Sequence, residues 1–200
     1  MFYYLEGQAS IIDQNTAVVD INGVGFKCYV TRNTLSYIED GKRQRLYTYC
    51  NIKEDTFDIY GFSTPNEKRC FELLIGVSGV GPKAAQAILS VIAPENLALA
   101  IINEDDKMIA TAQGVGKRTA QRVILELKDK IAKEMSGTIT AGAAAPVGGH
   151  MAGNVISEAA AALTVLGYSS AEITNAMRSM ETDGMTVEEI VKAVLKGSLA

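Results

Sequence analysis

The sequence predicts a multidomain α+β protein with a small β-barrel first, a helical domain second and a three-helix bundle last. Three observations support this prediction. Short runs of β-branched and aromatic residues fill positions 1–62. Helical periodicity runs through 63–135 and returns over 155–200. Between the two helical regions, residues 136–154 carry no charged side chain and are mostly Gly, Ala, Thr and Ser.

The first region is expected to form five short strands. They are expected at Tyr3–Ile12, Thr16–Ile21, Phe26–Val30, Arg45–Ile52 and Thr56–Phe62. Turn residues 22–25 separate the second strand from the third, and residues 53–55 separate the last two. So many short strands in so few residues predict a closed or partly closed barrel, which also leaves few exposed strand edges.

The helical region begins sharply at Thr64-Pro65-Asn66-Glu67, where threonine caps the helix, proline takes its first position and glutamate its third. Pro94 begins another short helix, and 117–134 forms a longer one. On that longer helix one apolar face is expected, formed by Val123, Leu127 and Ile131.

The last region follows a segment that cannot bury a core. Residues 136–154 are therefore expected to be a flexible linker. After it, a helix over 155–166 and two capping boxes, Ser169–Glu172 and Thr186–Glu189, predict three short helices. A compact bundle over 155–200 follows from them.

Basic charge is concentrated in one segment of an acidic chain. The formal net charge is -4, yet Lys117–Lys133 carries six basic side chains against two acidic ones. Such a stripe indicates a local site for an anionic partner, although a solvated helix face is the commoner explanation of a charge run.

Several classes of protein are excluded by simpler features. The three cysteines form no Cys-x-x-Cys pair, so neither a disulfide framework nor a metal site is expected. No signal peptide precedes the first strand, and no apolar run approaches about 18 residues, which predicts a cytoplasmic protein without a membrane partner.

An internal repeat with an offset of 35 residues carries the strongest functional signal. Residues 78–85 match 113–120, with a Gly-Val-Gly turn in each copy. The matched positions are Gly79 and Gly114, Val80 and Val115, Gly81 and Gly116, Ala85 and Ala120, and Lys83 and Arg118. In each copy one helix is expected to end, the chain to turn, and the next helix to begin at once. The glycines permit positive φ and a close approach of the backbone to another surface, while the valine points inward.

Both turns are predicted to bind phosphate. The N-terminus of a helix offers unpaired amide donors and a partial positive charge, which suit an anion. Lys83 in the first copy, and Lys117 and Arg118 in the second, add full charges. Arg122, further along the basic stripe, is also predicted to contact phosphate. A single Gly-x-Gly corner is more often a packing turn, but two copies followed by basic residues favour phosphate. Two phosphates on opposite strands of one duplex would be held without reading sequence, and binding would depend strongly on salt.

Nucleotide hydrolysis is not expected. Gly116-Lys117 looks like the end of a Walker A loop, but Thr111 stands where that loop needs glycine and Arg118 where it needs serine or threonine. No cofactor and no catalytic residue are predicted for this chain.

Taken together, these motifs make essentially the whole chain resemble the RuvA family, the Holliday-junction-binding subunits of the RuvAB branch-migration complex. The most specific matches are 53–55, 59–62 and 79–83. The resemblance implies an OB-fold barrel, a tandem helix-hairpin-helix domain and a terminal bundle like a ubiquitin-associated domain. It also implies a homotetramer that matches the four arms of a junction, with an octamer on DNA as a further possibility.

The family resemblance also implies roles for residues outside the repeat. The terminal bundle would bind the RuvB motor, an AAA+ ATPase, and the RuvC resolvase would join the larger complex. Leu163, Leu166 and Tyr168 would either dock the motor or form the core of the bundle. Glu54 and Asp55 would form an acidic pin, where by themselves they indicate only a solvated hairpin tip. In a fourfold assembly their charge would repel phosphates, keep strands apart and disfavour unbranched duplex.

Two other classes of protein stay open. A helix-hairpin-helix glycosylase or nuclease would need catalytic carboxylates, and Glu104-Asp105-Asp106 is the one dense acidic run, which is expected to start a helix instead. An assay for base excision or nicking separates this class. A pure interaction protein is the second alternative, and deletion of 155–200 distinguishes it, because a junction subunit would keep DNA binding and lose motor coupling.

Overall fold

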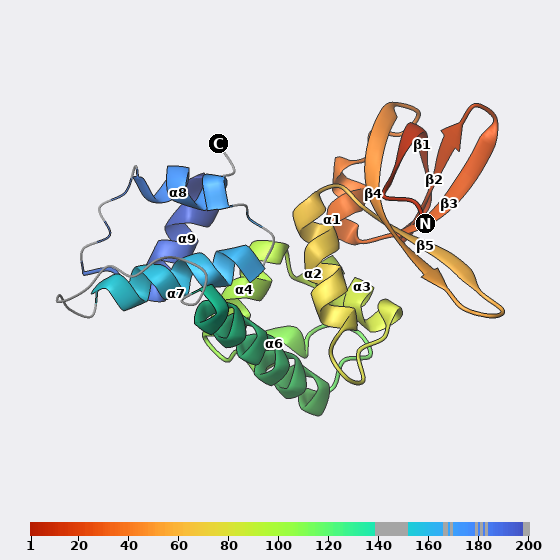
Figure 1. The fold of residues 1–200 in the computed structure, drawn as a ribbon. Coiled ribbons are helices and arrows are strands. Elements are labelled where there is room, and N and C mark those ends of the chain that lie inside the picture. The colour runs from red at the N-terminus through yellow and green to blue at the C-terminus, as the bar shows by residue number, and fades with distance from the viewer. Residues whose placement is uncertain are drawn as a thin grey trace.

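The computed structural model describes residues 1–138, 152–165, 168, 170–178, 180, 182 and 184–197. A strand-rich unit comes first and helices follow, with the central helices lying between the barrel and the C-terminal helices (Figure 1). The predicted fold class, α+β with an N-terminal OB-type barrel and helical domains after it, is confirmed.

The barrel is closed by five strands. They are β1 (Tyr4–Asp13), β2 (Thr16–Ile21), β3 (Val24–Val30), β4 (Arg43–Ile52) and β5 (Phe57–Phe62). Their order around the barrel is β1-β2-β3-β5-β4, with β3 and β5 parallel and all other neighbours antiparallel. Inward side chains such as Leu5, Val19 and Leu46 fill the interior because successive residues of a strand face opposite sides.

A short helix, α1 (Arg32–Tyr37), connects β3 to β4 and is not predicted by the sequence pattern. It has six residues and buries only Thr34, so it shows no apolar periodicity. The sequence feature that marks the start of α1 is its N-cap residue, Thr31, whose side chain accepts a hydrogen bond from the Thr34 amide.

The central helices are α2 (Pro65–Ile75), α3 (Pro82–Val91), α4 (Pro94–Ile102), α5 (Asp106–Ile109) and α6 (Lys117–Thr138). The predicted start of α2 is confirmed, since the Thr64 side chain accepts from the Glu67 amide at 3.1 Å. Val123 and Leu127 of α6 are buried as predicted, and the side chain of Ile131 lies outside those that the structure describes. Barrel and helices share a core, because the Phe71 ring lies 4.9 Å from that of Phe62 in β5.

The C-terminal helices are α7 (Ala152–Val165), α8 (Ser170–Arg178) and α9 (Val187–Gly197). The capping box at the start of α9 is confirmed, because the Thr186 amide donates to Glu189 Oε2 at 2.9 Å and the Glu189 amide donates to Thr186 Oγ1 at 3.3 Å. The other predicted box begins at position 169, outside the described residues. Leu99 and Ile102 of α4 pack against the core of this bundle.

The segment expected to be a linker is partly helical at both ends. Helix α6 continues through 136–138 and α7 already includes 152–154. No proline interrupts either end, and a formed helix propagates more easily than a new one nucleates. Residues 139–151, including His150, lie outside the described residues.

Among the described residues, no single helix is long and apolar enough to cross a membrane, and only the bent pair 82–91 and 96–102, at 101° to each other, meets that test jointly by length and composition.

Candidate nucleic-acid interface

The two Gly-Val-Gly turns have matching backbone geometry. The first connects α2 to α3 and the second connects α5 to α6. Gly79 has a φ of +85° and Gly114 a φ of +80°, conformations that favour glycine. The amides of Val80 and Val115 each donate at 3.0 Å to the carbonyl three residues earlier. The sequence repeat is thus a structural repeat.

Each turn buries its valine and exposes its glycines, as the repeat predicts. Val80 is 5% exposed and Val115 is 6% exposed. An added Cβ at Gly81 or Gly116 would meet nothing within 4 Å. The backbone of both turns is therefore accessible to a large partner.

Helix α3 begins without a side-chain cap. Its N-cap residue is Gly81, which has no side-chain acceptor for the first amides, whereas α2 and α5 are capped by Thr64 and Asp105. The first N–H groups of a helix lack internal partners and need an external acceptor. Water or an anion can take that place at α3.

Exposed cations surround these helix starts. Lys83 lies in the first turn of α3, and Lys117 and Arg118 are the first two residues of α6; all three side chains are exposed. A positive charge at the N-terminus of a helix opposes the helix dipole and costs some stability. Its presence at both turns is easier to explain by an anionic ligand than by folding.

Arg122 lies closer to the first turn than the sequence suggests. In the sequence it follows the second turn, but its Nη1 donates to the Ser78 carbonyl at 3.3 Å. An α6 side chain four residues after Arg118 therefore brings positive charge to the other turn. Arg122 connects the two repeats, which periodicity along one helix cannot reveal.

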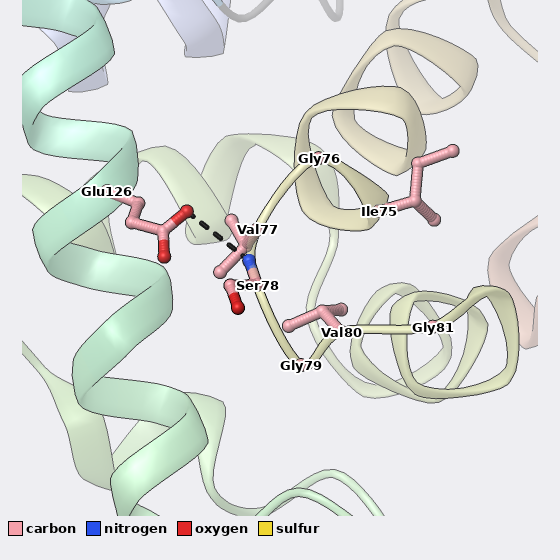
Figure 2. Close-up of a pocket in the computed structure, with 8 residues that line it drawn as sticks. All are labelled: Ile75, Gly76, Val77, Ser78, Gly79, Val80, Gly81 and Glu126. Carbon is pink, nitrogen blue, oxygen red and sulfur yellow. Dashed lines mark hydrogen bonds between the residues drawn. The ribbon is translucent and has the colours of Figure 1, made fainter.

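A carboxylate also reaches the first turn. Glu126, one helical turn after Arg122, accepts a hydrogen bond from the Ser78 amide at 3.3 Å. Together with residues 75–81, Glu126 lines an open pocket at this turn (Figure 2). The amide before Gly79 is thus occupied. The electrostatic environments of the two turns therefore differ, because among the described residues no carboxylate forms such a contact with the second turn.

Not every basic side chain of α6 is free to bind an anion. Lys128 Nζ lies 2.6 Å from Glu104 Oε1, and this hydrogen bond and charge lower the pKa of the Glu104 carboxyl. The other two carboxylates of the acidic run are also engaged: Asp105 caps α5, and Asp106 accepts from Gln121 Nε2 at 2.8 Å. This run starts a helix, as predicted.

No group of three or more His, Cys, Asp or Glu side chains that could hold a metal occurs within the part of the chain that the structure describes.

The residues Glu54 and Asp55 lie at the tip of the β4–β5 hairpin, which projects from the barrel as a long arm (Figure 1). Both are exposed, and the tip is closed by the Lys53 amide donating to the Thr56 carbonyl at 2.8 Å. The carboxylates are thus carried away from the barrel surface.

The three apolar residues considered for a partner surface behave differently. Leu163 is fully buried in the bundle core. Tyr168 is partly exposed and packs against both the bundle core and the core of the central helices. Position 166 lies outside the described residues.

A closed barrel, two matched glycine turns between helices and a terminal bundle define a tandem helix-hairpin-helix protein with an OB-type domain. Family models match accordingly: RuvA N terminal domain at 1–61, SAM-like Helix-hairpin-helix tandem at 71–129, and RuvA, C-terminal domain at 154–199. A relative from Acetivibrio thermocellus is 44% identical over 98% of both chains, and one from Bacteroides thetaiotaomicron is 40% identical over 98% of this chain and 99% of its own. Both are named Holliday junction branch migration complex subunit RuvA. The chain belongs to the RuvA family.

Proposed function

We propose that this protein binds four-way DNA junctions through their phosphates, without reading sequence, as a non-catalytic subunit of a branch-migration complex. The observation that carries the proposal is the pair of matched turns, each with exposed glycines and adjacent cations. The phosphate contacts are assigned to 79–81 and Lys83 at one turn and to 114–118 at the other, with Arg122 between them. Such contacts position a duplex but carry no base information.

The β4–β5 hairpin supplies the preference for a junction. In a homotetramer four such arms would gather near the crossover, where Glu54 and Asp55 repel phosphates and separate the strands. A continuous duplex would meet the same charges and gain no compensating contact. Fourfold symmetry matches four DNA arms, and a second tetramer on the opposite DNA face would give an octamer.

The terminal bundle, proposed to span 155–200, recruits the motor. The RuvB ATPase would supply the energy for branch migration in the cytoplasm, and the RuvC resolvase would act within the larger complex. Tyr168 supports this assignment, since a partly exposed aromatic side chain beside an apolar core suits a protein interface. Leu163 is part of the bundle core and stabilises the bundle. Leu166 is assigned, from its position in the sequence, to the same motor-binding surface as Tyr168.

Neutralising the pin tests the junction preference. Glu54→Gln with Asp55→Asn is expected to lower the ratio of four-way to duplex affinity by about tenfold, because two charges near the crossover no longer disfavour duplex. Gel-shift titration with a four-way junction and a duplex of equal length measures this ratio. Glu39→Gln with Asp40→Asn, an exposed acidic pair elsewhere on the barrel, is the matched control. An unchanged ratio would remove the pin from the mechanism.

A single substitution tests the motor surface in the full chain. Tyr168→Ala is expected to weaken stimulation of the motor ATPase about tenfold, the scale of losing a buried aromatic contact, while junction affinity stays within about twofold. Thr164→Ala, on the exposed side of α7, should change neither. Equal loss of junction binding in the Tyr168 variant would contradict the division of labour between bundle and turns.

A further inference from the structure

A buried carboxylate lies at the joint between the barrel and the central helices. Glu67, in the first turn of α2, is 2% exposed. One of its oxygens accepts from Thr31 Oγ1, and the other accepts from Thr34 Oγ1 at 2.7 Å and from Ser63 Oγ at 3.3 Å. The described residues place no ion pair on it. Glu67 therefore connects α2 to the start of α1 and to the exit of β5.

The donors in this network have little choice of partner. Thr31 Oγ1 already accepts from the Thr34 amide at 3.0 Å, and Thr34 Oγ1 accepts from the Ser63 amide at 2.9 Å. Each hydroxyl hydrogen is left for Glu67, and a carboxylate can accept on both oxygens. The geometry thus fits a carboxylate better than the side-chain amide of glutamine. The amide nitrogen cannot accept a hydrogen bond, yet it would face one of the hydroxyl hydrogens.

A second set of polar contacts connects α3 to the end of β3 and to α1. Gln86 Nε2 donates to the Val30 carbonyl at 2.7 Å, and Asn33 Nδ2 donates to the Leu89 carbonyl at 2.6 Å. Because α3 begins at the first Gly-Val-Gly turn, the helix that presents this turn is bonded to the barrel. The barrel in turn carries the β4–β5 hairpin.

Stability alone is a poor reason for this arrangement. Burial raises the pKa of the Glu67 carboxyl even though the hydroxyl hydrogen bonds act in the opposite direction. A buried charge without a cation is costly, and apolar packing of the same volume is often at least as stable. What the carboxylate adds is a fixed geometry. Its two oxygens accept from hydroxyls of Thr31, Thr34 and Ser63 together only when α1, α2 and the end of β5 are placed as they are here.

We propose that Glu67 is a positioning residue that fixes the angle between the β4–β5 hairpin and the phosphate-binding turns. Glu67 itself contacts no DNA. It acts by setting the relative placement of the hairpin tip and the turns, which would make the contacts. The inference rests on the proposed function, since the fixed angle lets hairpin and turns engage one junction together. Loosening the joint should leave each part intact and uncouple them.

The test uses Glu67→Gln in the full chain. The expected results are a broader distance distribution between spin labels and a ratio of four-way to duplex affinity reduced about fivefold. Duplex affinity and its salt dependence should stay close to those of the parent. The thermal midpoint should fall, because the amide nitrogen leaves one buried hydroxyl without its acceptor. Labels at Ile52→Cys and Leu125→Cys suit the distance measurement, because both sites are more than 60% exposed, at 62% and 64%, and the three native cysteines are buried.

Two controls separate the possible results. Glu189→Gln removes a capping carboxylate outside the joint and should leave distance and ratio unchanged. Thr34→Val removes a donor to Glu67 and should reproduce the broadening even if Glu67→Gln fails to fold. Unchanged label distances in the folded joint variants overturn the inference. If the hairpin-tip variant keeps its junction preference while the distances broaden, the positioning role stands and the proposed pin fails.

Discussion

Replacing Gly81 and Gly116 together by alanine is expected to remove most DNA binding while leaving the fold intact. Each glycine follows the buried valine of its turn, and an added Cβ there meets nothing within 4 Å. Gly81 has a φ of -86°, which alanine adopts freely. The methyl group would project where a phosphate must approach the amides. A loss of about 100-fold corresponds to about 2.8 kcal/mol, the range of one or two displaced charge-assisted hydrogen bonds.

The other glycine of each turn provides the matched control. At Gly79 and Gly114, with φ of +85° and +80°, alanine strains the backbone. Each such substitution is expected to lower the free energy of unfolding by about 1–2 kcal/mol. Thermal unfolding and fluorescence anisotropy with labelled duplex, measured on both pairs, should separate a stability effect from a binding effect. Normal binding by the Gly81 and Gly116 variant would show that the backbone does not approach DNA at these turns.

The order of domains could be predicted because local signals agree with the fold. Thr64 and Pro65 mark the first long helix by capping chemistry, and the structure places the helix start there. The Gly-Val-Gly repeat gave the geometry of both turns, since a positive φ at the first glycine and a buried valine leave few alternatives. These features depend on neighbours in the sequence, where a pattern is informative.

Contacts between distant residues could not be predicted in this way. Arg122 and Glu126 meet Ser78 across 44 and 48 positions of sequence. Glu67 shows the same limit: its place in a capping box suggests a bond back to the helix start, but its carboxylate meets hydroxyls from α1, with Thr31 lying 36 positions away. The packing of α6 against the first turn determines the contacts of Arg122 and Glu126, and the packing of the barrel against α2 determines those of Glu67.

Replacing Lys117 and Arg118 by alanine is expected to weaken binding to junction and duplex alike, by about 10–100-fold at moderate salt. Lys117 and Arg118 are the first residues of α6, and both side chains are exposed. Among the described residues neither forms an ion pair. Each phosphate contact contributes about 0.9 to the slope of log affinity against log salt, so the slope should fall by one to two units. Titrations at several salt concentrations, on unrelated DNA sequences, measure both quantities.

Lys42→Ala with Arg43→Ala is the matched control, because it changes net charge equally on an adjacent exposed pair at the start of β4. A general loss of attraction between protein and DNA would affect both variants, whereas a bound phosphate at the second turn affects only the first. Stability adds an independent criterion. Since cations at the start of α6 oppose the helix dipole, their removal should leave the thermal midpoint unchanged or slightly raised. Weaker binding by a protein that is no less stable then means that these two charges serve the ligand, and an unchanged salt slope would exclude them from phosphate contact.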